Sequence, residues 1–409
     1  MTLYEDLLYR GLIKDISSEE LKDKLNNEKL TFYIGTDPTA DSLHIGHLSS
    51  FLISKRLKDA GHNPILLIGG ATGRIGDPRP TSEREMKSIE EINHNIEALT
   101  KQVKDLFGFE IVNNYDWSKD INFIDFLRDY GKYFNINYML DKDIIRRRLE
   151  TGITYTEFSY MIMQALDYLH LYETKNCTLQ VAGSDQWGNI TAGIDLIRKK
   201  KQKEVYGFTM PLVTTKNGTK FGKSEGNALW LDKNKTSSYK MYQYLINLED
   251  EMIIDYLKIF TFLSKDEIEK IAIEVKNNPE QRLAQKTLAK EIITFLHGEE
   301  EYQRALKLTE KLFSNDFNNL EKKDIVDIFN EEEIKDIKIN KNIIDILVDC
   351  NIASSKREAR EFVLGNAISI NGEKVNDPNI IIDNKYLIDN TYIIFKRGKK
   401  NYYTFKAIN

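Results

Sequence analysis

The sequence predicts an α/β protein: a doubly wound, parallel-sheet (Rossmann-like) domain, then an α-helical domain and a small α+β domain. Three observations lead to this prediction. Strand, loop, helix and strand patterns follow one another near the start, a second such series occurs near residue 180, and the later sequence turns helical before a compact tail. A chain of 409 residues also exceeds what one hydrophobic core usually organises.

The first series begins with TFYIG at residues 31–35, followed by the turn-rich DPTADS. Leu48, Leu52, Ile53 and Leu57 then recur at helical spacing, and Gly61 supplies a C-terminal stop. The next segment, PILLIGG, is a short uncharged run suited to a parallel strand buried on both faces. Together these segments form one βαβ unit.

The second series is CTLQVAG at 177–183, a helix from about Asp185 to Lys199, and a strand FTMPLV at 208–213. We therefore assign residues 1–230 to the Rossmann-like catalytic domain, with ligands at the carboxyl ends of its strands. Charged amphipathic stretches predict a helical domain over 231–335. A tail over 341–409 contains a short helix, a strand-turn-strand at AISINGEKV and a final strand pair.

The composition is that of a globular protein without a signal peptide or membrane-spanning segment. Hydrophobic residues make up 41% and charged residues 30%, which is typical of an ordinary globular protein. The opening MTLYEDLLYRG lacks the basic and apolar regions of a signal peptide, and no stretch approaches 18 uncharged apolar residues, so we expect a cytoplasmic protein without membrane contact. Cys177 and Cys350 lie far apart, which favours neither a disulfide framework nor a zinc site.

The charge is unevenly distributed along the chain. The net charge is −5, yet residues 341–409 hold 11 Lys and Arg against 8 Asp and Glu. A mildly basic tail on an acidic body fits contact with a polyanion, and fits a solvated surface equally well.

Two glycine-rich segments resemble nucleotide loops without matching them. GGATGRIGDP at 69–78 follows a strand but reads GxxGxxG, which misses the dinucleotide fingerprint GxGxxG and disfavours a nicotinamide enzyme. GTKFGKS at 218–224 is one residue short of a P-loop.

The stretch DSLHIGH places His44 and His47 around Gly46 at the start of a helix. Glycine lets a nucleotide lie against the backbone, and a helix N-terminus turns N–H groups toward a phosphate. The histidines could then donate hydrogen bonds to a triphosphate. Two alternatives stay open: a zinc site, for which Asp37 is a poor third ligand, and a structural role in which one histidine caps the helix and the other is exposed.

PTADSLHIGH at 38–47, followed by KFGKS at 220–224, resembles the paired signature motifs of class I aminoacyl-tRNA synthetases. YIGTDPTADSLHIGH, GGATGRIGDP, TEFSYMIMQALDYL and GSDQWGNI are similar to the bacterial tyrosyl-tRNA synthetase family, and the likeness extends over essentially the whole chain. The tail is similar to the small RNA-binding domain called S4. The resemblance implies ATP-dependent formation of tyrosyl-adenylate, then transfer of tyrosine to tRNA(Tyr).

The resemblance also implies roles for individual residues. Catalysis would rest on His44, His47, Lys220, Lys223 and Gln186. The phenol of tyrosine would contact Tyr33 and Asp167, and its ammonium Asp77, Tyr160 and Gln164. The ATP site would comprise Gly35, Asp37, His44, Gly46, His47, Gly183, Asp185, Lys220, Lys223 and Ser224. Mg²⁺ would travel with the ATP phosphates, and no dedicated metal site is expected.

Two observations qualify this assignment. Tyr160, Gln164 and Asp167 share one helix face, a spacing that core residues also show, and Asp185 could be a plain N-cap. The chain also departs from the family at Ile34, where several relatives carry cysteine, and at Thr81, where a lysine is usual. Arg84 matches a basic position.

The tail suggests an RNA surface in which basic and aromatic residues alternate. Its candidate contacts are Lys356, Arg357, Arg360, Lys396, Arg397, Lys399 and Lys400. The family implies a homodimer, and FLRDYGKYFNINYML at 126–140 is rich enough in aromatics to form its interface or to pack in a core. Two other functions are compatible with parts of the sequence: an adenylating ligase that uses no RNA, and a catalytically inactive paralogue that binds RNA.

Overall fold

The computed structural model describes residues 1–78, 86–150, 152–224, 227–317, 319–329, 331, 334–398 and 401–408. The chain forms two compact units. The first consists of Met1–Lys235 and Leu248–Leu288, and the second of Thr236–Asn247 and Ala289–Asn409. The helical segment over 231–335 thus contributes helices to both units.

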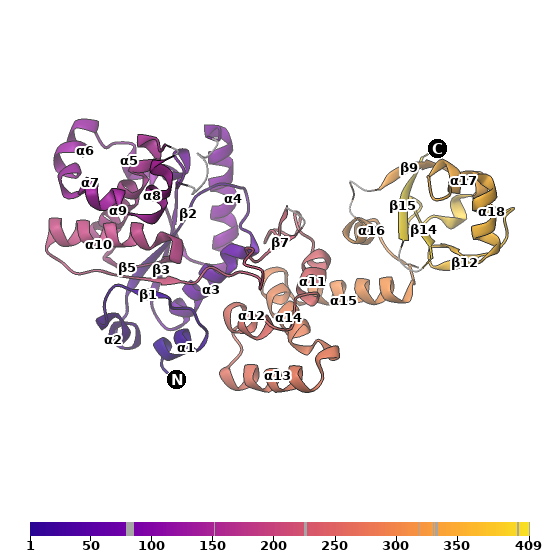
Figure 1. Cartoon of the computed structure of the whole chain (residues 1–409), viewed down its shortest axis with the longest axis horizontal. Coiled ribbons are helices and arrows are strands. Elements are labelled where there is room, and N and C mark those ends of the chain that lie inside the picture. The colour runs from indigo at the N-terminus through magenta and orange to yellow at the C-terminus, as the bar shows by residue number, and fades with distance from the viewer. Residues whose placement is uncertain are drawn as a thin grey trace. The chain divides into compact units, whose positions relative to one another are not determined.

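The first unit is built on a six-stranded sheet (Figure 1). Its order is β1 (Asp15–Ile16), β6 (Tyr206–Met210), β5 (Cys177–Gly183), β2 (Thr31–Thr36), β3 (Asn63–Ile68) and β4 (Glu110–Asn113). All neighbours are parallel except β1 and β6. From β2 the chain adds β3 and β4 on one side and β5 and β6 on the other, which confirms the doubly wound parallel sheet and places a topological switch point between β2 and β5.

The sheet carries its own helices and short connecting turns. The helices are α1 (Leu3–Tyr9), α2 (Glu20–Asn27), α3 (Ile45–Asp59), α4 (Ile89–Phe107), α5 (Tyr115–Ser118), α6 (Phe123–Asp129), α7 (Ile136–Leu140), α8 (Asp143–Leu149), α9 (Tyr155–Lys175), α10 (Trp187–Lys201), α12 (Ile253–Phe260) and α13 (Lys265–Asn277). Single 3₁₀ turns occupy Thr72–Arg74, Gly131–Tyr133, Ser184–Gln186 and Pro279–Gln281, and a small hairpin pairs β7 (Lys223–Ser224) with β8 (Asn227–Ala228).

Most element boundaries follow the sequence pattern. Strand β5 has the expected limits, and α3 begins one residue after His44. The strand expected at 208–213 was wrong at its end: β6 stops at Met210 because Pro211 has no N–H to donate to a ladder. The helix expected from Asp185 begins instead at Trp187, after the 3₁₀ turn.

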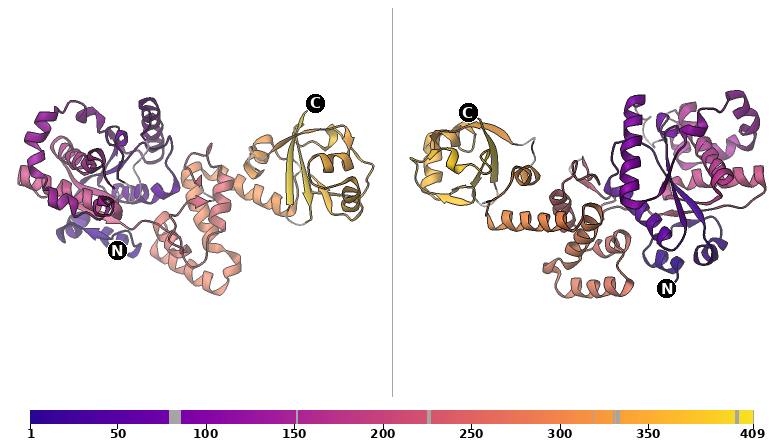
Figure 2. Two further views of the ribbon diagram at one scale, coloured as in Figure 1. Left: turned by 45° about the horizontal axis from the view of Figure 1, so that its top comes forward. Right: turned by 180° about the vertical axis from the view of Figure 1, so that it is seen from behind.

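The second unit combines helices with a five-stranded sheet (Figures 1 and 2). Its helices are α11 (Ser238–Ile246), the later part of α14 (Leu283–His297), α15 (Glu299–Ser314), α16 (Lys322–Phe329), α17 (Ile343–Asp349) and α18 (Lys356–Leu364). The sheet order is β12 (Glu373–Val375), β11 (Ile368–Ile370), β14 (Tyr392–Arg397), β15 (Asn401–Ile408) and β9 (Lys335–Lys338). Strands β10 (Lys341–Asn342) and β13 (Ile381–Ile382) pair separately, and Asn384–Tyr386 forms a 3₁₀ turn.

Strand β9 runs parallel to β15 and so belongs to the tail's sheet, although it precedes residue 341. A hydrophobic cluster also joins the tail to helices of this unit, since Ile388, Tyr392 and Ile394 pack with Tyr239 and Leu308. No described helix is long and apolar enough to cross a membrane.

Candidate active site

The candidate site lies where the switch point predicts it, at the carboxyl ends of the parallel strands. Tyr33 belongs to β2, and Gly35 is exposed near the end of that strand with nothing within 4 Å of where a Cβ would stand. Gly183 ends β5, the neighbour of β2. This edge of the sheet therefore gathers side chains from segments far apart in the sequence.

His44 and His47 cap helix α3 reciprocally. The Nδ1 atom of His44 accepts the Gly46 N–H at 3.1 Å, and Nδ1 of His47 accepts the His44 N–H at 3.3 Å. The rings stack with centroids 3.8 Å apart, and a Cβ on Gly46 would meet the His44 ring at 2.9 Å. Because each Nδ1 accepts a hydrogen bond, the neutral ring carries its proton on Nε2, the atom that can donate to an anion.

Burial lowers the pKa of His47 to about 3, and the positive charges of His44 and Lys220 act in the same direction. His47 is therefore neutral at physiological pH. The structural alternative is partly realised, since His44 is the N-cap, but neither ring is fully exposed.

The two signature segments are joined by backbone hydrogen bonds. The Ile45 N–H donates to the Leu229 carbonyl at 2.8 Å, and the Leu231 N–H donates to the Leu43 carbonyl at 2.8 Å. His44 also forms a single antiparallel bridge with Trp230. The chain that follows KFGKS is thus paired along the chain that leads into α3.

KFGKS itself begins in a tight hairpin over residues 213–222, which we call the lysine hairpin. Lys220 pairs with Thr214, the Phe221 N–H donates to the Val213 carbonyl at 3.0 Å, and Gly218 turns the chain with φ of +76°. Lys220 is exposed. Lys223 and Ser224 follow in β7, but their side chains lie outside the described residues.

A buried carboxylate lies at the centre of a second cluster. Asp167 of α9 is 2% exposed, and its oxygens accept hydrogen bonds from Asn114 Nδ2 and Trp117 Nε1, both at 2.9 Å. Burial raises the pKa of Asp167 to about 7, although both donors act to lower it. A carboxyl group with this pKa is half ionised near neutral pH.

The hydroxyl of Tyr33 lies beside this cluster. The Tyr33 side chain is 1% exposed, and among the described residues its hydroxyl has no hydrogen-bond partner. Burial raises the pKa of Tyr33, and the negative charge of Asp167 adds to the shift. A buried polar atom without a partner is costly, so this hydroxyl is suited to a ligand.

Asp37 lies with this second cluster. Its Oδ2 accepts the Tyr160 hydroxyl at 3.1 Å, and its Oδ1 accepts the Thr72 hydroxyl at 2.8 Å. Asn114 also donates to Thr72 Oγ1 at 3.1 Å, so a continuous network links Tyr160 to Asp167. The expectation assigned Asp37 to the ATP site, and two of its contacts are with Tyr160, which was expected at the tyrosine ammonium, and with Thr72.

A third network connects the loop after β3 with the segment after β5. Gln186 Nε2 donates to Asp77 Oδ2 at 2.9 Å, and Asn189 Nδ2 donates to both Gln186 Oε1 at 2.8 Å and Gln164 Oε1 at 3.1 Å. Asp185 accepts from Gln186 and caps no helix, since the N-cap of α10 is Gln186 without a side-chain bond. Asp77 and Gln164, which were expected at the tyrosine ammonium, are thus brought together with Gln186, which was expected in catalysis.

Sequence reasoning missed Thr72, Asn114, Trp117 and Asn189. Each is held in these networks by a partner that lies on a different strand or helix. Their only sequence signal is position, because Thr72 and Asn114 follow strands β3 and β4. Thr81 and Arg84 lie outside the described residues.

The candidate RNA contacts of the tail differ in their surroundings. Lys356, Arg357 and Arg360 are exposed on α18, with ion pairs from Lys356 to Asp345 and from Arg357 to Glu361. Lys396 instead contacts Asn315, and Arg397 donates to the Ile352 carbonyl at 2.6 Å. Lys399 and Lys400 lie outside the described residues.

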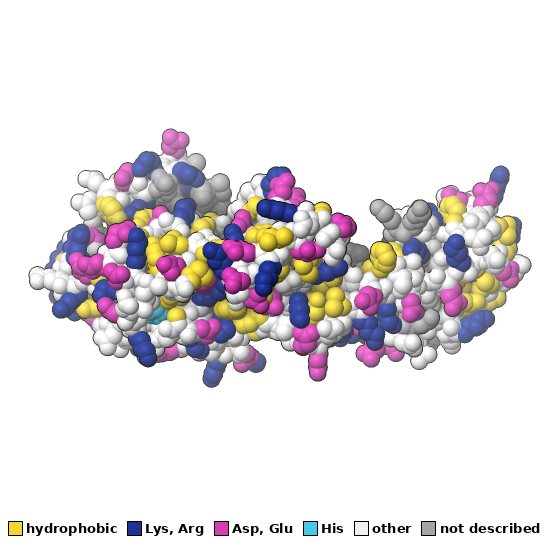
Figure 3. All heavy atoms as spheres, turned by 90° about the horizontal axis from the view of Figure 1, so that it is seen from below, with side chains coloured by type: hydrophobic (Ala, Val, Ile, Leu, Met, Phe, Trp, Pro, Cys, Tyr) yellow, Lys and Arg dark blue, Asp and Glu magenta, His cyan; other side chains and the backbone are white. Residues whose placement is uncertain are grey.

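No described group of three or more His, Cys, Asp or Glu side chains could hold a metal ion. On the face shown in Figure 3, Lys and Arg side chains are interspersed with Asp and Glu.

A doubly wound parallel sheet with a capped histidine pair beside a lysine-bearing hairpin is the arrangement expected of a class I aminoacyl-tRNA synthetase. Residues 25–314 match the family of class I tRNA synthetases described as W and Y, and residues 324–405 match the tyrosine--tRNA ligase SYY-like C-terminal domain. The chain therefore belongs to the class I aminoacyl-tRNA synthetases of the tyrosine and tryptophan family.

Individual proteins of known name are similar to this chain over most of their length. The chain is 49% identical over 414 residues to the tyrosine--tRNA ligase of Leuconostoc mesenteroides, covering 100% of both proteins. It is 48% identical to tyrosine--tRNA ligase 2 of Bacillus cereus, covering 98% of this chain and 99% of that protein. A C-terminally truncated mitochondrial tyrosyl-tRNA synthetase of Aspergillus nidulans has a similar structure, with 33% identity and a TM-score of 0.68 over 76% of this chain and 94% of that one.

Proposed function

We propose that this enzyme ligates L-tyrosine to tRNA(Tyr), with ATP as the second substrate of its family. The observation that carries the choice of tyrosine is the buried Tyr33 hydroxyl, which has no partner among the described residues, together with the buried Asp167 carboxylate that acts on it electrostatically. A phenol between them would donate to Asp167 and accept from Tyr33. Phenylalanine would leave both groups unpaired, and tyrosyl-tRNA synthetases are themselves the familiar example of discrimination by this means.

The first step would be attack by the tyrosine carboxylate on the α-phosphorus of ATP. A bond forms from a carboxylate oxygen to phosphorus, and the bond from phosphorus to the bridging oxygen breaks, so that pyrophosphate leaves with the electron pair. The Nε2–H groups of His44 and His47 would donate to the phosphates, with Lys220 and Lys223 holding the leaving group. Such donors act by stabilising the charge that grows in the transition state.

The second step would transfer the tyrosyl group to the terminal ribose of tRNA(Tyr). A ribose hydroxyl attacks the carbonyl carbon of the adenylate, AMP leaves, and the hydroxyl proton passes to the departing phosphate. The step requires close positioning of the two reactants rather than a covalent enzyme intermediate.

Tyrosine would be held at its other end by Asp77 and Gln164 of the third network and by Tyr160 of the second cluster. Acceptor oxygens of these side chains suit an ammonium group, and Gln186 extends the network toward the α-phosphate. Mg²⁺ would enter with ATP as part of that substrate, bound by phosphates and water.

The tail supports a role in holding the tRNA, through the three exposed basic residues of α18. Neutralising Lys356, Arg357 and Arg360 together should raise the KM for tRNA(Tyr) and leave adenylate formation unchanged, because these side chains lie in a unit separate from the candidate site. Equal loss in both assays would contradict this role.

We also propose a homodimer. Phe126, Tyr130, Tyr133 and Phe134 pack against the core of the first unit, so core packing explains those aromatics. The apolar side chains left exposed nearby are Phe123, Ile124, Leu127, Ile136 and Tyr138. An exposed apolar group of this size favours an interface. Ile124→Lys should shift the mass in solution toward a monomer, and an unchanged mass would contradict this face.

The deciding experiment is amino-acid-dependent exchange of labelled pyrophosphate into ATP, with tyrosine, phenylalanine and tryptophan offered separately. Exchange with tyrosine alone is expected. Exchange with none of them, from folded protein, would contradict the proposed activity and favour the RNA-binding alternative, which no observation described above supports.

A further inference from the structure

Helix α12 contacts both arms of the lysine hairpin through one residue. The Tyr256 hydroxyl donates to the Thr214 carbonyl at 3.0 Å, and the Tyr256 ring lies 4.6 Å from the Phe221 ring. Thr214 is the residue paired with Lys220, and Phe221 is its chain neighbour. Tyr256 is 2% exposed and therefore fixes the hairpin from its buried side.

Other contacts strengthen this attachment. Phe260, one turn further along α12, stacks on Phe221 with centroids 4.9 Å apart. Lys216 near the tip of the hairpin forms an ion pair with Glu251, just before α12 begins. The base of the hairpin is thus bound to α12 by buried aromatic packing and a hydrogen bond, whereas the contact described above for its tip is an exposed ion pair.

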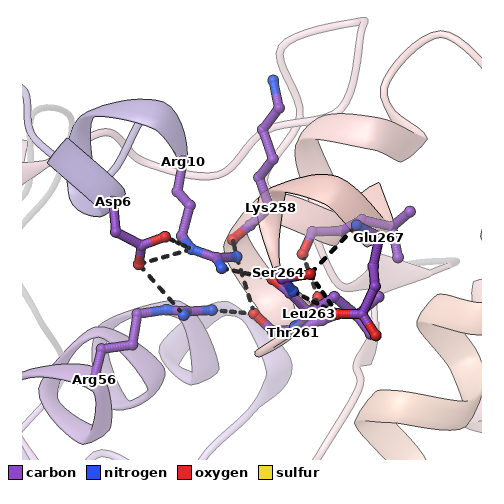
Figure 4. Close-up of polar contacts among 9 residues, drawn as sticks. Asp6, Arg10, Arg56, Lys258, Thr261, Leu263, Ser264 and Glu267 are labelled. Atoms are coloured by element: carbon purple, nitrogen blue, oxygen red, sulfur yellow. Dashed lines mark hydrogen bonds and ion pairs between the residues drawn. The ribbon is translucent and has the colours of Figure 1, made fainter. Parts of the chain in front are cut away.

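The far end of α12 is held by two buried arginines (Figure 4). Arg10 donates to the carbonyls of Lys258 at 3.0 Å and Leu263 at 2.6 Å, and Arg56 donates to the Thr261 carbonyl. Asp6 is the carboxylate that pairs with both guanidinium groups.

The charges explain why this end of the helix cannot shift freely. The single negative charge of Asp6 balances one of the two positive guanidinium charges. The remaining positive charge is stabilised by carbonyl groups at the C-terminus of α12, where the helix dipole is negative. Moving α12 would break charge-assisted hydrogen bonds in a buried place, which is expensive. Arg56 belongs to α3, the helix that begins at the histidine pair, so α12 connects that helix to the lysine hairpin.

We propose that Tyr256 is a positioning residue that sets the location of Lys220 for the reaction. The proposal rests on the proposed function, because it assumes that Lys220 holds the pyrophosphate. Tyr256→Phe would keep the ring packed on Phe221 and remove only the hydroxyl. The Thr214 carbonyl would lose its donor, and the strand that pairs with Lys220 would be free to move.

The test is steady-state pyrophosphate exchange by the full-length chain, comparing wild type, Tyr256→Phe and Tyr206→Phe. Tyr206 is the matched control, since its hydroxyl donates to Glu20 at 3.1 Å, away from the candidate site. For Tyr256→Phe, kcat should fall about tenfold and the KM for pyrophosphate should rise. The KM for tyrosine should stay within about twofold, because its contacts lie on β2 and α9. Tyr206→Phe should match wild type.

The possible results distinguish failure of the positioning role from failure of the proposed function. Unchanged kcat and pyrophosphate KM in Tyr256→Phe would overturn the positioning role. A rise in tyrosine KM that matches the fall in kcat would also overturn it, because that is the pattern of a general disturbance. Absence of tyrosine-dependent exchange in the wild-type protein would instead overturn the proposed function. Thermal unfolding of each variant shows that the folded protein is being compared.

Discussion

The Ile45 N–H donates to the Leu229 carbonyl at 2.8 Å, which ties the first turn of α3 to the chain that follows the lysine hairpin. The segment PTADSLHIGH and the chain that follows KFGKS, far apart in the sequence, are therefore joined by backbone hydrogen bonds.

The closeness of the two segments depends on Gly222. This glycine has φ of +82°, and an added Cβ would stand 1.9 Å from Ile45 Cγ2. Gly222→Ala should lower kcat for pyrophosphate exchange by at least about tenfold and lower Tm, because the hairpin must move off α3. Gly218→Ala is the matched control: φ is +76° with nothing within 4 Å, so it carries the backbone strain without the clash. Equal effects of the two changes would contradict this account.

The neutral state of His47 predicts how activity and stability respond to pH. Its pKa of about 3 lies below the ordinary 6.5, so the ring stays neutral throughout the working range and kcat should show no titration from it between pH 6 and 9. His47→Ala should lower kcat by roughly 10²-fold, the usual cost of one transition-state donor. His94→Ala, which changes an exposed histidine, should leave kcat unchanged.

The lowered pKa of His47 also makes the stability of the folded protein depend on pH. As pH falls below 6.5, the unfolded chain binds a proton that the folded His47 does not, so stability declines from that pH toward 3. In His47→Gln this part of the decline should disappear, as measured by denaturant unfolding at several pH values. An identical pH profile in the variant would contradict the assignment.

Asp167 predicts a pH dependence of tyrosine binding. Its pKa of about 7 means that the carboxyl group becomes protonated below neutrality, and the neutral group is a weaker acceptor for the hydrogen bond from the phenol than the carboxylate is. The KM for tyrosine should therefore rise below pH 7, toward about tenfold per pH unit. Asp167→Asn should have a high KM that does not vary with pH over the same range. A pH-independent KM in the wild type would show that this group does not titrate on binding.

The raised pKa also affects folding in the opposite direction to that of His47. The shift contributes stability below pH 3.8, where both states are protonated, and that contribution is lost as pH rises through 7. In Asp167→Asn this decline in stability between pH 3.8 and 7 should disappear, as measured by denaturant unfolding at several pH values.

Trp117 predicts a change in selectivity. Its Nε1 donates to Asp167 Oδ1 at 2.9 Å, and its ring stacks on His170 with centroids 4.2 Å apart. Trp117→Phe keeps a stacking ring but removes the donor, so the carboxylate should lose its fixed orientation. The ratio of kcat/KM for tyrosine over phenylalanine should fall about 10- to 150-fold, by the cost of a hydrogen bond to a charged group. An unchanged ratio would assign Trp117 to packing alone.

Several parts of the fold could be predicted from local pattern. The βαβ unit from Thr31 to Ile68 is marked by alternating strand and helix periodicity, and Gly61 closes its helix with φ of +99°. His44 and His47 could be placed at a helix start because their spacing and the intervening glycine are local features. The end of β6 was misjudged because apolar content outweighed the effect of Pro211.

The partners of the buried groups could not be predicted. Asn114 and Trp117 reach Asp167 across 53 and 50 residues, and Tyr256 reaches Thr214 across 42. No periodicity links such positions, because their contact depends on the order of the strands and on how each helix packs. For the same reason the sequence did not show that Asp37 turns toward Tyr160.

The sequence by itself determined which residue types are present, where each signature segment lies and which local elements carry them, because those depend on spacing along the chain. The tertiary structure alone decided the protonation of His47 and Asp167, the orphaned hydroxyl of Tyr33 and the attachment of the lysine hairpin to α12. These properties arise from desolvation and from contacts between distant segments, which exist only once the sheet order has brought the segments together.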